Sequence, residues 1–201
     1  MISSVVLAAG GAQRLGQQKL FLPLSGKPVL QWVLESALAS ELGEVVCVTR
    51  ELESARRQLN LSNERLVWLT NHAADRGQST SVIAGLWATH PSSDGAMFLV
   101  GDQPLISKEL INALIEKFTA ESAWIVAPTF KQQPRNPVVF RRNLFPELLQ
   151  LTGDRGGRIL INKHKNNTLL VEWNDEIPFL DLDVHEDYER LRQIAYGAIK
   201  A

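Results

Sequence analysis

The sequence predicts an α/β fold with a mostly parallel central sheet, helices on both of its faces and a small antiparallel addition in the C-terminal half. Short apolar runs alternate with longer stretches of helical period, which is the pattern of repeated βαβ units. These runs are continuous, as expected of strands that are buried on both faces. The chain has 201 residues, 45% of them hydrophobic, and no linker composition interrupts it, so we expect a single domain over 1–201.

The elements follow in order along the chain. The expected strands are the apolar runs 2–7, 45–49, 66–69, 96–100 and 124–127, and the expected helices between them are 29–39, 51–59, 79–89 and 108–119. After Pro128 the pattern changes to an extended run at 136–140, a helix over 143–151, a glycine-rich turn at 153–157 and a last helix from about 185 to 198. This change predicts the antiparallel or β-ribbon addition.

Composition excludes several classes of protein. The 21 Lys and Arg residues against 22 Asp and Glu residues give a net charge of -1, which argues against nucleic acid or an anionic membrane as the main partner. Cys47 is the only cysteine and lies in an apolar run, so we expect a buried small side chain and no disulfide or cysteine-based zinc site. No apolar run approaches the roughly 20 residues of a membrane span, and the expected location is the cytoplasm.

A glycine-rich loop follows the first expected strand. Gly10, Gly11 and Gly16 permit unusual backbone angles, and Arg14 and Lys19 add two cations to a loop at the carboxyl end of a strand. Such a loop forms an anion-binding concavity, for which a triphosphate is the natural occupant. The spacing matches neither the P-loop nor the dinucleotide fingerprint. The alternative is an ordinary surface turn with two solvated cations.

Carboxylates follow two other segments. Asp102 comes directly after the run 96–100, at the end of a buried strand, and one carboxylate there suits Mg²⁺; the alternative is an Asx turn before Pro104. Asp181 and Asp183 alternate along an extended segment and so share one face, although Asp183 is also placed to cap the last helix.

Two further segments are polar. The stretch 76–86 opens a helix with several hydroxyl side chains, one of which is explained by capping. Arg155 and Arg158 flank the glycine-rich turn, a reasonable clamp for a second phosphate.

The loop also carries a family resemblance. Leu7-Ala8-Ala9-Gly10 with Arg14, Gly16 and Lys19, continuing into 20–30, resembles the opening signature of nucleotidyltransferases related to the molybdenum cofactor guanylyltransferases and cytidylyltransferases. The resemblance implies a three-layer Rossmann-like nucleotidyltransferase fold, with Leu7, Ala8, Ala9, Gly10 and Gly11 at the nucleotide and Arg14 and Lys19 on its phosphates. Ala12 is a departure, because relatives usually carry Gly or Ser there.

Other motifs extend the resemblance along the chain. Gly101-Asp102-Gln103-Pro104 is similar to the family's metal-binding motif, which makes Asp102 catalytic together with Arg14 and Lys19, and 181–188 is similar to the segment that completes the metal site. The implied metal is Mg²⁺, or Mn²⁺, on Asp102 and Asp183, with Asp181 as a weaker ligand. The stretch 76–86 resembles an element that contacts base and ribose, which implicates Gln78 and Ser81. The segments 135–140 and 153–158 resemble acceptor-side motifs, which implies acceptor binding by Asn136, Asp154, Arg155 and Arg158.

The resemblance implies a reaction. CMP is transferred from CTP to the molybdopterin form of the molybdenum cofactor, with release of pyrophosphate, and a molybdenum hydroxylase or its insertion chaperone is the expected recipient. CTP is preferred over GTP because guanylyl relatives usually read Leu-Ala-Gly-Gly, whereas the methyl group of Ala9 narrows the pocket. The alternatives are guanylyl transfer to the same cofactor and nucleotidyl transfer to a sugar phosphate. A non-catalytic cofactor carrier and a nucleotide-binding regulatory domain are the alternatives from other classes.

Charge is also unevenly distributed along the chain. Residues 1–27 contain three cations and no acid, whereas 172–189 contain eight acids and no Lys or Arg. We therefore expect the cationic loop and the C-terminal acids to meet in one cleft.

Overall fold

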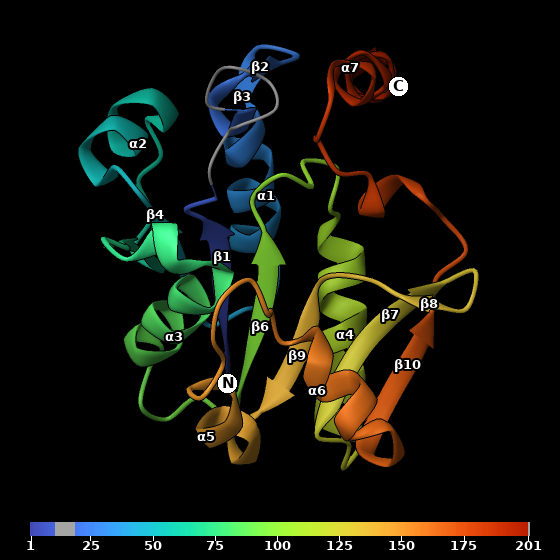
Figure 1. The fold of residues 1–201 in the computed structure, drawn as a ribbon. Coiled ribbons are helices and arrows are strands. Elements are labelled where there is room, and N and C mark those ends of the chain that lie inside the picture. The colour runs from blue at the N-terminus through green and yellow to red at the C-terminus, as the bar shows by residue number, and fades with distance from the viewer. Residues whose placement is uncertain (11–18, 201) are drawn as a thin grey trace.

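The computed structural model describes residues 1–10 and 19–200, the last three by their backbone alone. An eight-stranded sheet with the order β10-β7-β9-β6-β1-β4-β5 forms its centre, and β8 pairs with β7 (Figure 1). The strands of this sheet are β1 (Ile2–Ala8), β4 (Glu44–Thr49), β5 (Leu66–Thr70), β6 (Gly95–Val100), β7 (Ile125–Phe130), β8 (Gln133–Pro134), β9 (Val138–Arg141) and β10 (Thr168–Glu172).

The sheet is mostly parallel, as predicted. β1 pairs in parallel with β4 and with β6, β4 with β5, and β7 with β10. The antiparallel part comes from the C-terminal half, because β9 inserts between β6 and β7 and runs antiparallel to both. The predicted α/β class with an antiparallel addition is therefore confirmed, and the added strand lies inside the sheet.

Helices cover both faces of this sheet and give three layers (Figure 1). α1 (Val29–Leu38) and α4 (Lys108–Ala120) pack their buried residues against one face, while α3 (Gln78–Ala88), α5 (Phe145–Leu148) and α6 (Arg158–Lys163) pack against the other. α2 (Leu52–Leu59) completes the predicted set in the N-terminal half. Cys47 is fully buried in the first of these cores, and burial raises the pKa of its thiol.

Several elements differ from the sequence prediction. The helix expected over 143–151 is divided into a 3₁₀ turn, Arg142–Leu144, and the four-residue α5. β10 and α6 had no counterpart in the prediction; β10 is an edge strand paired only with β7 and is half exposed, so its apolar signal is weak. A second, two-stranded sheet of β2 (Pro23–Leu24) and β3 (Lys27–Pro28) was also missed.

The C-terminal helix packs on this small hairpin. α7 (His185–Lys200) buries Leu191 and Ala195 against Leu24 and Val29, and the Tyr188 hydroxyl donates a hydrogen bond to the carbonyl oxygen of Pro23. The chain of 180–183 that leads into α7 consequently passes over the carboxyl edge of the sheet, where the amide of Leu182 donates to the carbonyl oxygen of Asp102 at 2.9 Å. None of the helices in the described ranges is long and apolar enough to cross a membrane.

Candidate active site

The carboxyl ends of four parallel strands meet at one edge of the sheet and carry the site. Ala9 and Gly10 follow β1, Arg50 follows β4, Asn71 follows β5, and Gly101 with Asp102 follows β6. Gly101 lies so close to β1 that an added Cβ would be 3.2 Å from the carbonyl oxygen of Leu7, and its amide donates to that oxygen. This edge is the usual ligand crevice of open α/β sheets.

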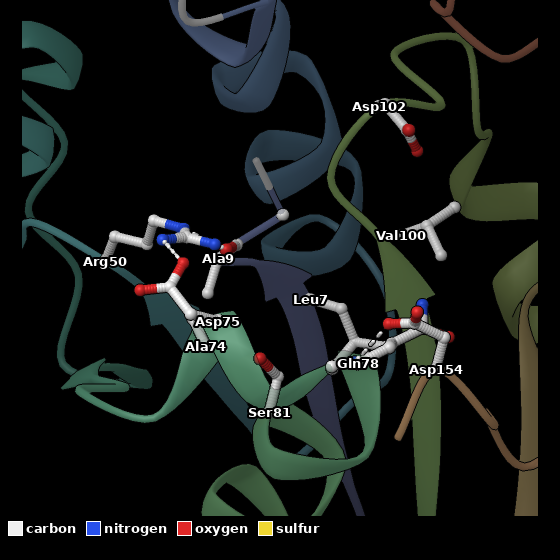
Figure 2. Close-up of a pocket in the computed structure, with 12 residues that line it drawn as sticks. Leu7, Ala9, Arg50, Ala74, Asp75, Gln78, Ser81, Val100, Asp102 and Asp154 are labelled. Carbon is white, nitrogen blue, oxygen red and sulfur yellow. Dashed lines mark hydrogen bonds and ion pairs between the residues drawn. The ribbon is translucent and has the colours of Figure 1, made fainter. Parts of the chain in front are cut away.

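A cavity of about 420 Å³ lies along this edge (Figure 2). The residues that line it are Leu7, Ala9, Gly10, Arg50, Ala74, Asp75, Gly77, Gln78, Ser81, Val100, Asp102 and Asp154. The structure thus brings together predicted nucleotide residues from the glycine loop, from the start of α3 and from the end of β6. Ala8 does not line the cavity, because its side chain is buried in the core. Gly11 and Arg14 lie outside the described residues.

The start of α3 is held by a loop from the second half of the chain. Gly77 precedes the helix with φ +108° and ψ 168°, a conformation that only glycine adopts readily. The amide of Ser79 donates to the carbonyl oxygen of Gly153 at 3.0 Å, and the amide of Gln78 donates to Asp154 Oδ1 at 3.4 Å. Asp154, predicted on the acceptor side, therefore lies at the helix N-terminus and lines the cavity.

Ser81 points into the same cavity from the first turn of α3. Its hydroxyl accepts a hydrogen bond from Asn71 Nδ2 at 2.9 Å, and the same amide nitrogen donates to Thr80 at 2.9 Å. Asn71 is buried, and its Oδ1 accepts from the amide of Ala73. This network fixes the loop between β5 and α3, and Asn71 at its centre belongs to none of the motifs seen in the sequence.

Lys19, Asp102 and Asp183 form one cluster. Lys19 Nζ lies 2.7 Å from Asp102 Oδ2 and 2.9 Å from Asp183 Oδ1. Burial acts to lower the pKa of Lys19, but attraction and hydrogen bonds from the two carboxylates outweigh it and raise the pKa above its ordinary value. Lys19, the cation next to the glycine loop that the structure describes, therefore meets the C-terminal acids at Asp183, which agrees with the segregation of charge in the sequence.

Asp181 lies beside this cluster without joining its ion pairs. Its Oδ1 accepts a hydrogen bond from Gln103 Nε2 at 2.8 Å. Burial, and then the negative charges of Asp102 and Asp183, raise the pKa of this carboxyl. Among the described residues, no three His, Cys, Asp or Glu side chains form a ready metal cluster.

The donor set nevertheless fits a hard divalent cation. Asp102 and Asp183 each direct a carboxylate oxygen at one cationic centre, the Lys19 ammonium group, so both oxygens approach a common point. Mg²⁺ and Mn²⁺ prefer oxygen ligands and bind phosphates through one or two carboxylates. Asp102 and Asp183 are therefore the residues that would hold such an ion.

The remaining predicted acceptor residues lie elsewhere. Arg155 and Arg158 line a second cavity of about 450 Å³ together with Gln133, Pro134, Gly156, Ile159, Ile161 and Asn162. Arg158 Nη2 donates to the carbonyl oxygen of Pro134 at 2.8 Å. Asn136 precedes a cis peptide bond to Pro137 and is half buried between β8 and β9. Gly156 of the second cavity lies close to Gln78 of the first, since an added Cβ would lie 2.8 Å from Gln78 Oε1.

Sequence reasoning missed the two charged residues Arg50 and Asp75, which line the cavity. Arg50 Nε donates to the carbonyl oxygen of Ala9 at 2.7 Å, and Arg50 Nη1 lies 2.6 Å from Asp75 Oδ1 (Figure 2). The available signal was the position of Arg50 directly after a predicted strand, at the sheet edge where ligands bind.

The three-layer fold and the cavity at the carboxyl edge of the sheet define an α/β protein whose ligand site lies where open α/β sheets bind small molecules. The model of one family, described as the MobA-like NTP transferase domain, matches residues 4–168. The chain belongs to this family, and the resemblance drawn from the sequence is confirmed at that level.

Similar proteins carry varied names. The purine catabolism protein PucB of Bacillus subtilis is 32% identical over 94% of this chain and 95% of its own length. Nicotine blue oxidoreductase of Paenarthrobacter nicotinovorans is 28% identical over 94% and 96% of the two chains. A protein of Natranaerobius thermophilus named as a molybdenum cofactor guanylyltransferase is 29% identical over 63% and 60%. The structure of Rv0371C from Mycobacterium tuberculosis in complex with manganese has a TM-score of 0.77 and 27% identity, covering 96% of this chain and 98% of that one.

Proposed function

We propose that this nucleotidyltransferase transfers CMP from CTP to the molybdopterin form of the molybdenum cofactor and releases pyrophosphate. The observation that carries the proposal is the 420 Å³ cavity, in which the residues after β1, the start of α3 and Asp102 converge from separate parts of the chain. The product would pass to a molybdenum hydroxylase or its insertion chaperone.

The reaction needs no strong general base. The second pKa of a phosphomonoester is about 6, so the acceptor phosphate is already anionic near pH 7. One of its oxygens attacks the α-phosphorus of CTP, a new phosphorus–oxygen bond forms, and the bond from the α-phosphorus to the bridging oxygen breaks as pyrophosphate leaves. Catalysis rests on alignment and on neutralising the charge of the phosphates.

The residues of the site supply both requirements. Lys19 is already charged and placed beside Asp102, and in the proposal it neutralises the leaving pyrophosphate together with Arg14. A divalent ion held by Asp102 and Asp183 would supply further neutralisation of the triphosphate. Gln78 and Ser81 hold the nucleoside part of the donor from the first turn of α3, where both line the cavity.

The acceptor side is proposed on the second cavity. Arg155 and Arg158 line it, and the loop 153–157 connects it to the nucleotide cavity through the contact of Gly156 with Gln78. Two guanidinium groups suit the anionic acceptor. In the proposal Asn136 and Asp154 also bind the acceptor, Asp154 from the wall of the nucleotide cavity.

The choice of CTP rests on the glycine loop. Ala9 lines the cavity where guanylyl relatives usually carry glycine, and its methyl group reduces the room for a purine. One methyl group contributes about 1 to 3 kcal/mol of discrimination. Guanylyl transfer is the result that would replace this choice, since three similar proteins are named as molybdenum cofactor guanylyltransferases.

The test is pyrophosphate release with Mg²⁺, each of the four nucleoside triphosphates, and either molybdopterin cofactor or a panel of sugar phosphates. We expect release with CTP and the molybdopterin cofactor. Asp102→Asn and Lys19→Met should each lower kcat by roughly 100-fold or more, because each removes charge stabilisation at the phosphates.

Lys163→Met is the matched control for Lys19→Met. Lys163 also pairs with a carboxylate at 2.7 Å, on Glu147, and lies in α6, so its loss should leave the rate unchanged. Release with sugar phosphates but none with molybdopterin cofactor would overturn the acceptor assignment. Full activity of Asp102→Asn would remove that carboxylate from the mechanism.

A further inference from the structure

The nucleotide cavity has two chemically different ends. Along the carboxyl edge of the sheet, the ends of β6, β1, β4 and β5 follow one another in space, and they carry Asp102, the glycine loop, Arg50 and the β5–α3 loop respectively. Neighbouring strands are about 4.8 Å apart, so β6 and β5 are separated by roughly 14 Å. Asp102, which pairs with Lys19, marks the β6 end, and the pair formed by Arg50 and Asp75 marks the other (Figure 2).

The Arg50 guanidinium group is fixed from two sides. Its Nε donates to the carbonyl oxygen of Ala9 at 2.7 Å, and its Nη1 pairs with Asp75 Oδ1 at 2.6 Å. An isolated surface ion pair of this kind contributes little to stability. Here, however, the guanidinium group also binds the backbone at Ala9, directly after β1, and it holds the carboxylate of Asp75 at the wall of the cavity.

Asp75 retains most of its capacity to accept hydrogen bonds. A carboxylate offers about four acceptor positions, and the contact with Arg50 uses one of them. The Asp75 side chain is 85% exposed, so its other positions are accessible from the cavity that it lines. Arg50 already neutralises Asp75, so this end of the cavity has no net positive charge to attract phosphates. The proposed function places the phosphates beside Lys19, and the nucleobase then faces Asp75.

We propose that Asp75, positioned by Arg50, selects the nucleobase by accepting a hydrogen bond from its exocyclic amino group. This inference rests on the proposed nucleotide function. Cytosine and guanine carry such an amino group, whereas uracil has a carbonyl oxygen in the place of the cytosine amino group, and hypoxanthine lacks the 2-amino group of guanine. A carboxylate attracts the amino hydrogen and repels the carbonyl oxygen, so CTP is favoured over UTP, and GTP over ITP.

The test measures binding of nucleotide pairs that differ at this group. The dissociation constants of CTP, UTP, GTP and ITP are measured by titration calorimetry with Mg²⁺ and without acceptor, on the unmodified chain and on Asp75→Asn. A hydrogen bond to a charged group contributes about 1.5 to 3 kcal/mol, so its loss is expected to change affinity by about 10-fold or more. The relevant pair, CTP with UTP or GTP with ITP, is the one that the unmodified chain binds more tightly. In Asp75→Asn the ratio of the two dissociation constants in that pair should fall by about this factor. The asparagine amide no longer favours the amino group, because it can also donate a hydrogen bond to a carbonyl oxygen of the base.

A matched control separates this role from the loss of a surface charge. Glu176→Gln breaks an exposed pair with Arg190, which is 2.7 Å long and lies outside the cavity, and should leave both preferences unchanged. Thermal unfolding of each variant verifies that it is folded. Unchanged preferences in folded Asp75→Asn would overturn the role of Asp75 alone. Absence of binding for all four nucleotides to the unmodified chain would instead overturn the proposed function itself.

Discussion

Replacing Gly77 by alanine should disturb both the backbone at the start of α3 and the loop that covers it. Gly77 has φ +108° and ψ 168°, a region that is open essentially to glycine alone. An added Cβ would overlap the carbonyl group of Gly153 and lie 2.8 Å from the amide nitrogen of Asp154. These are backbone atoms, so a side-chain rotation cannot relieve the contact, and the loop has to move away from the helix.

The magnitude follows from these two effects. The strained conformation costs about 1 to 3 kcal/mol, and loss of the hydrogen bond from the Ser79 amide to Gly153 costs about 1 kcal/mol more. The free energy of unfolding should therefore fall by about 2 to 4 kcal/mol. For a chain of this length, 1 kcal/mol corresponds to roughly 2–4 °C in Tm, so Gly77→Ala should lower Tm by about 4–16 °C.

Gly26→Ala is the matched control. Gly26 also has a positive φ, +87°, but nothing lies within 4 Å of an added Cβ. It should report the backbone effect alone, about 1–2 kcal/mol, which corresponds to a fall of about 2–8 °C in Tm. Thermal and urea unfolding measure both variants. If Gly77→Ala were no less stable than Gly26→Ala, the close packing of the 153–154 loop on α3 would be refuted.

Three other predictions concern pH, thiol reactivity and metal. Burial acts to raise the pKa of Glu35, but hydrogen bonds from Lys27 and Gln31 outweigh it and hold the pKa below its ordinary value of 4.5. Glu35→Gln should therefore lower Tm at pH 7, and the difference in Tm from the unmodified chain should shrink as the pH falls below about 4.5. Thermal unfolding at several pH values measures this, and a difference that stays constant with pH would contradict it. Cys47 is fully buried and burial raises the pKa of its thiol, so a thiol reagent should modify it only as fast as the chain unfolds. Rapid labelling of the folded protein would contradict the burial of Cys47. Chelation of divalent metal should stop pyrophosphate release, and adding Mg²⁺ or Mn²⁺ should restore it. The Tm of the nucleotide-free protein should change little on chelation, because Lys19 already pairs with both Asp102 and Asp183. A large fall in Tm would instead show that the metal is structural.

Most of the sheet could be predicted because its signals are local. The runs that became β1, β4 and β6 are continuous and apolar, and strands buried on both faces need that composition. The antiparallel position of β9 inside the sheet could not be predicted, because strand order depends on which edges remain open once the parallel strands have assembled. β10 was missed since an edge strand needs less apolar sequence than a central one.

Candidate site residues were predictable where they belong to one segment. The glycine loop, Asp102 and Gln78 could be singled out because their motifs are contiguous. The partnership of Arg50 with Asp75 could not, because 25 positions separate them and neither residue type is unusual where it stands. The split of the acceptor motif, with Asp154 in one cavity and Arg155 in the other, likewise follows from the path of a loop across α3.

The sequence by itself determined the fold class, the family and the segments that carry the chemistry, because periodicity and contiguous motifs are properties of the chain. Only the tertiary structure decided which of these segments touch. Lys19 lies on Asp102 and Asp183, and Asp154 lies on the start of α3, because the hairpin β2–β3 holds α7 and Gly77 admits the 153–154 loop. Such contacts join residues tens to more than a hundred positions apart, and their geometry is set by packing that no local pattern encodes.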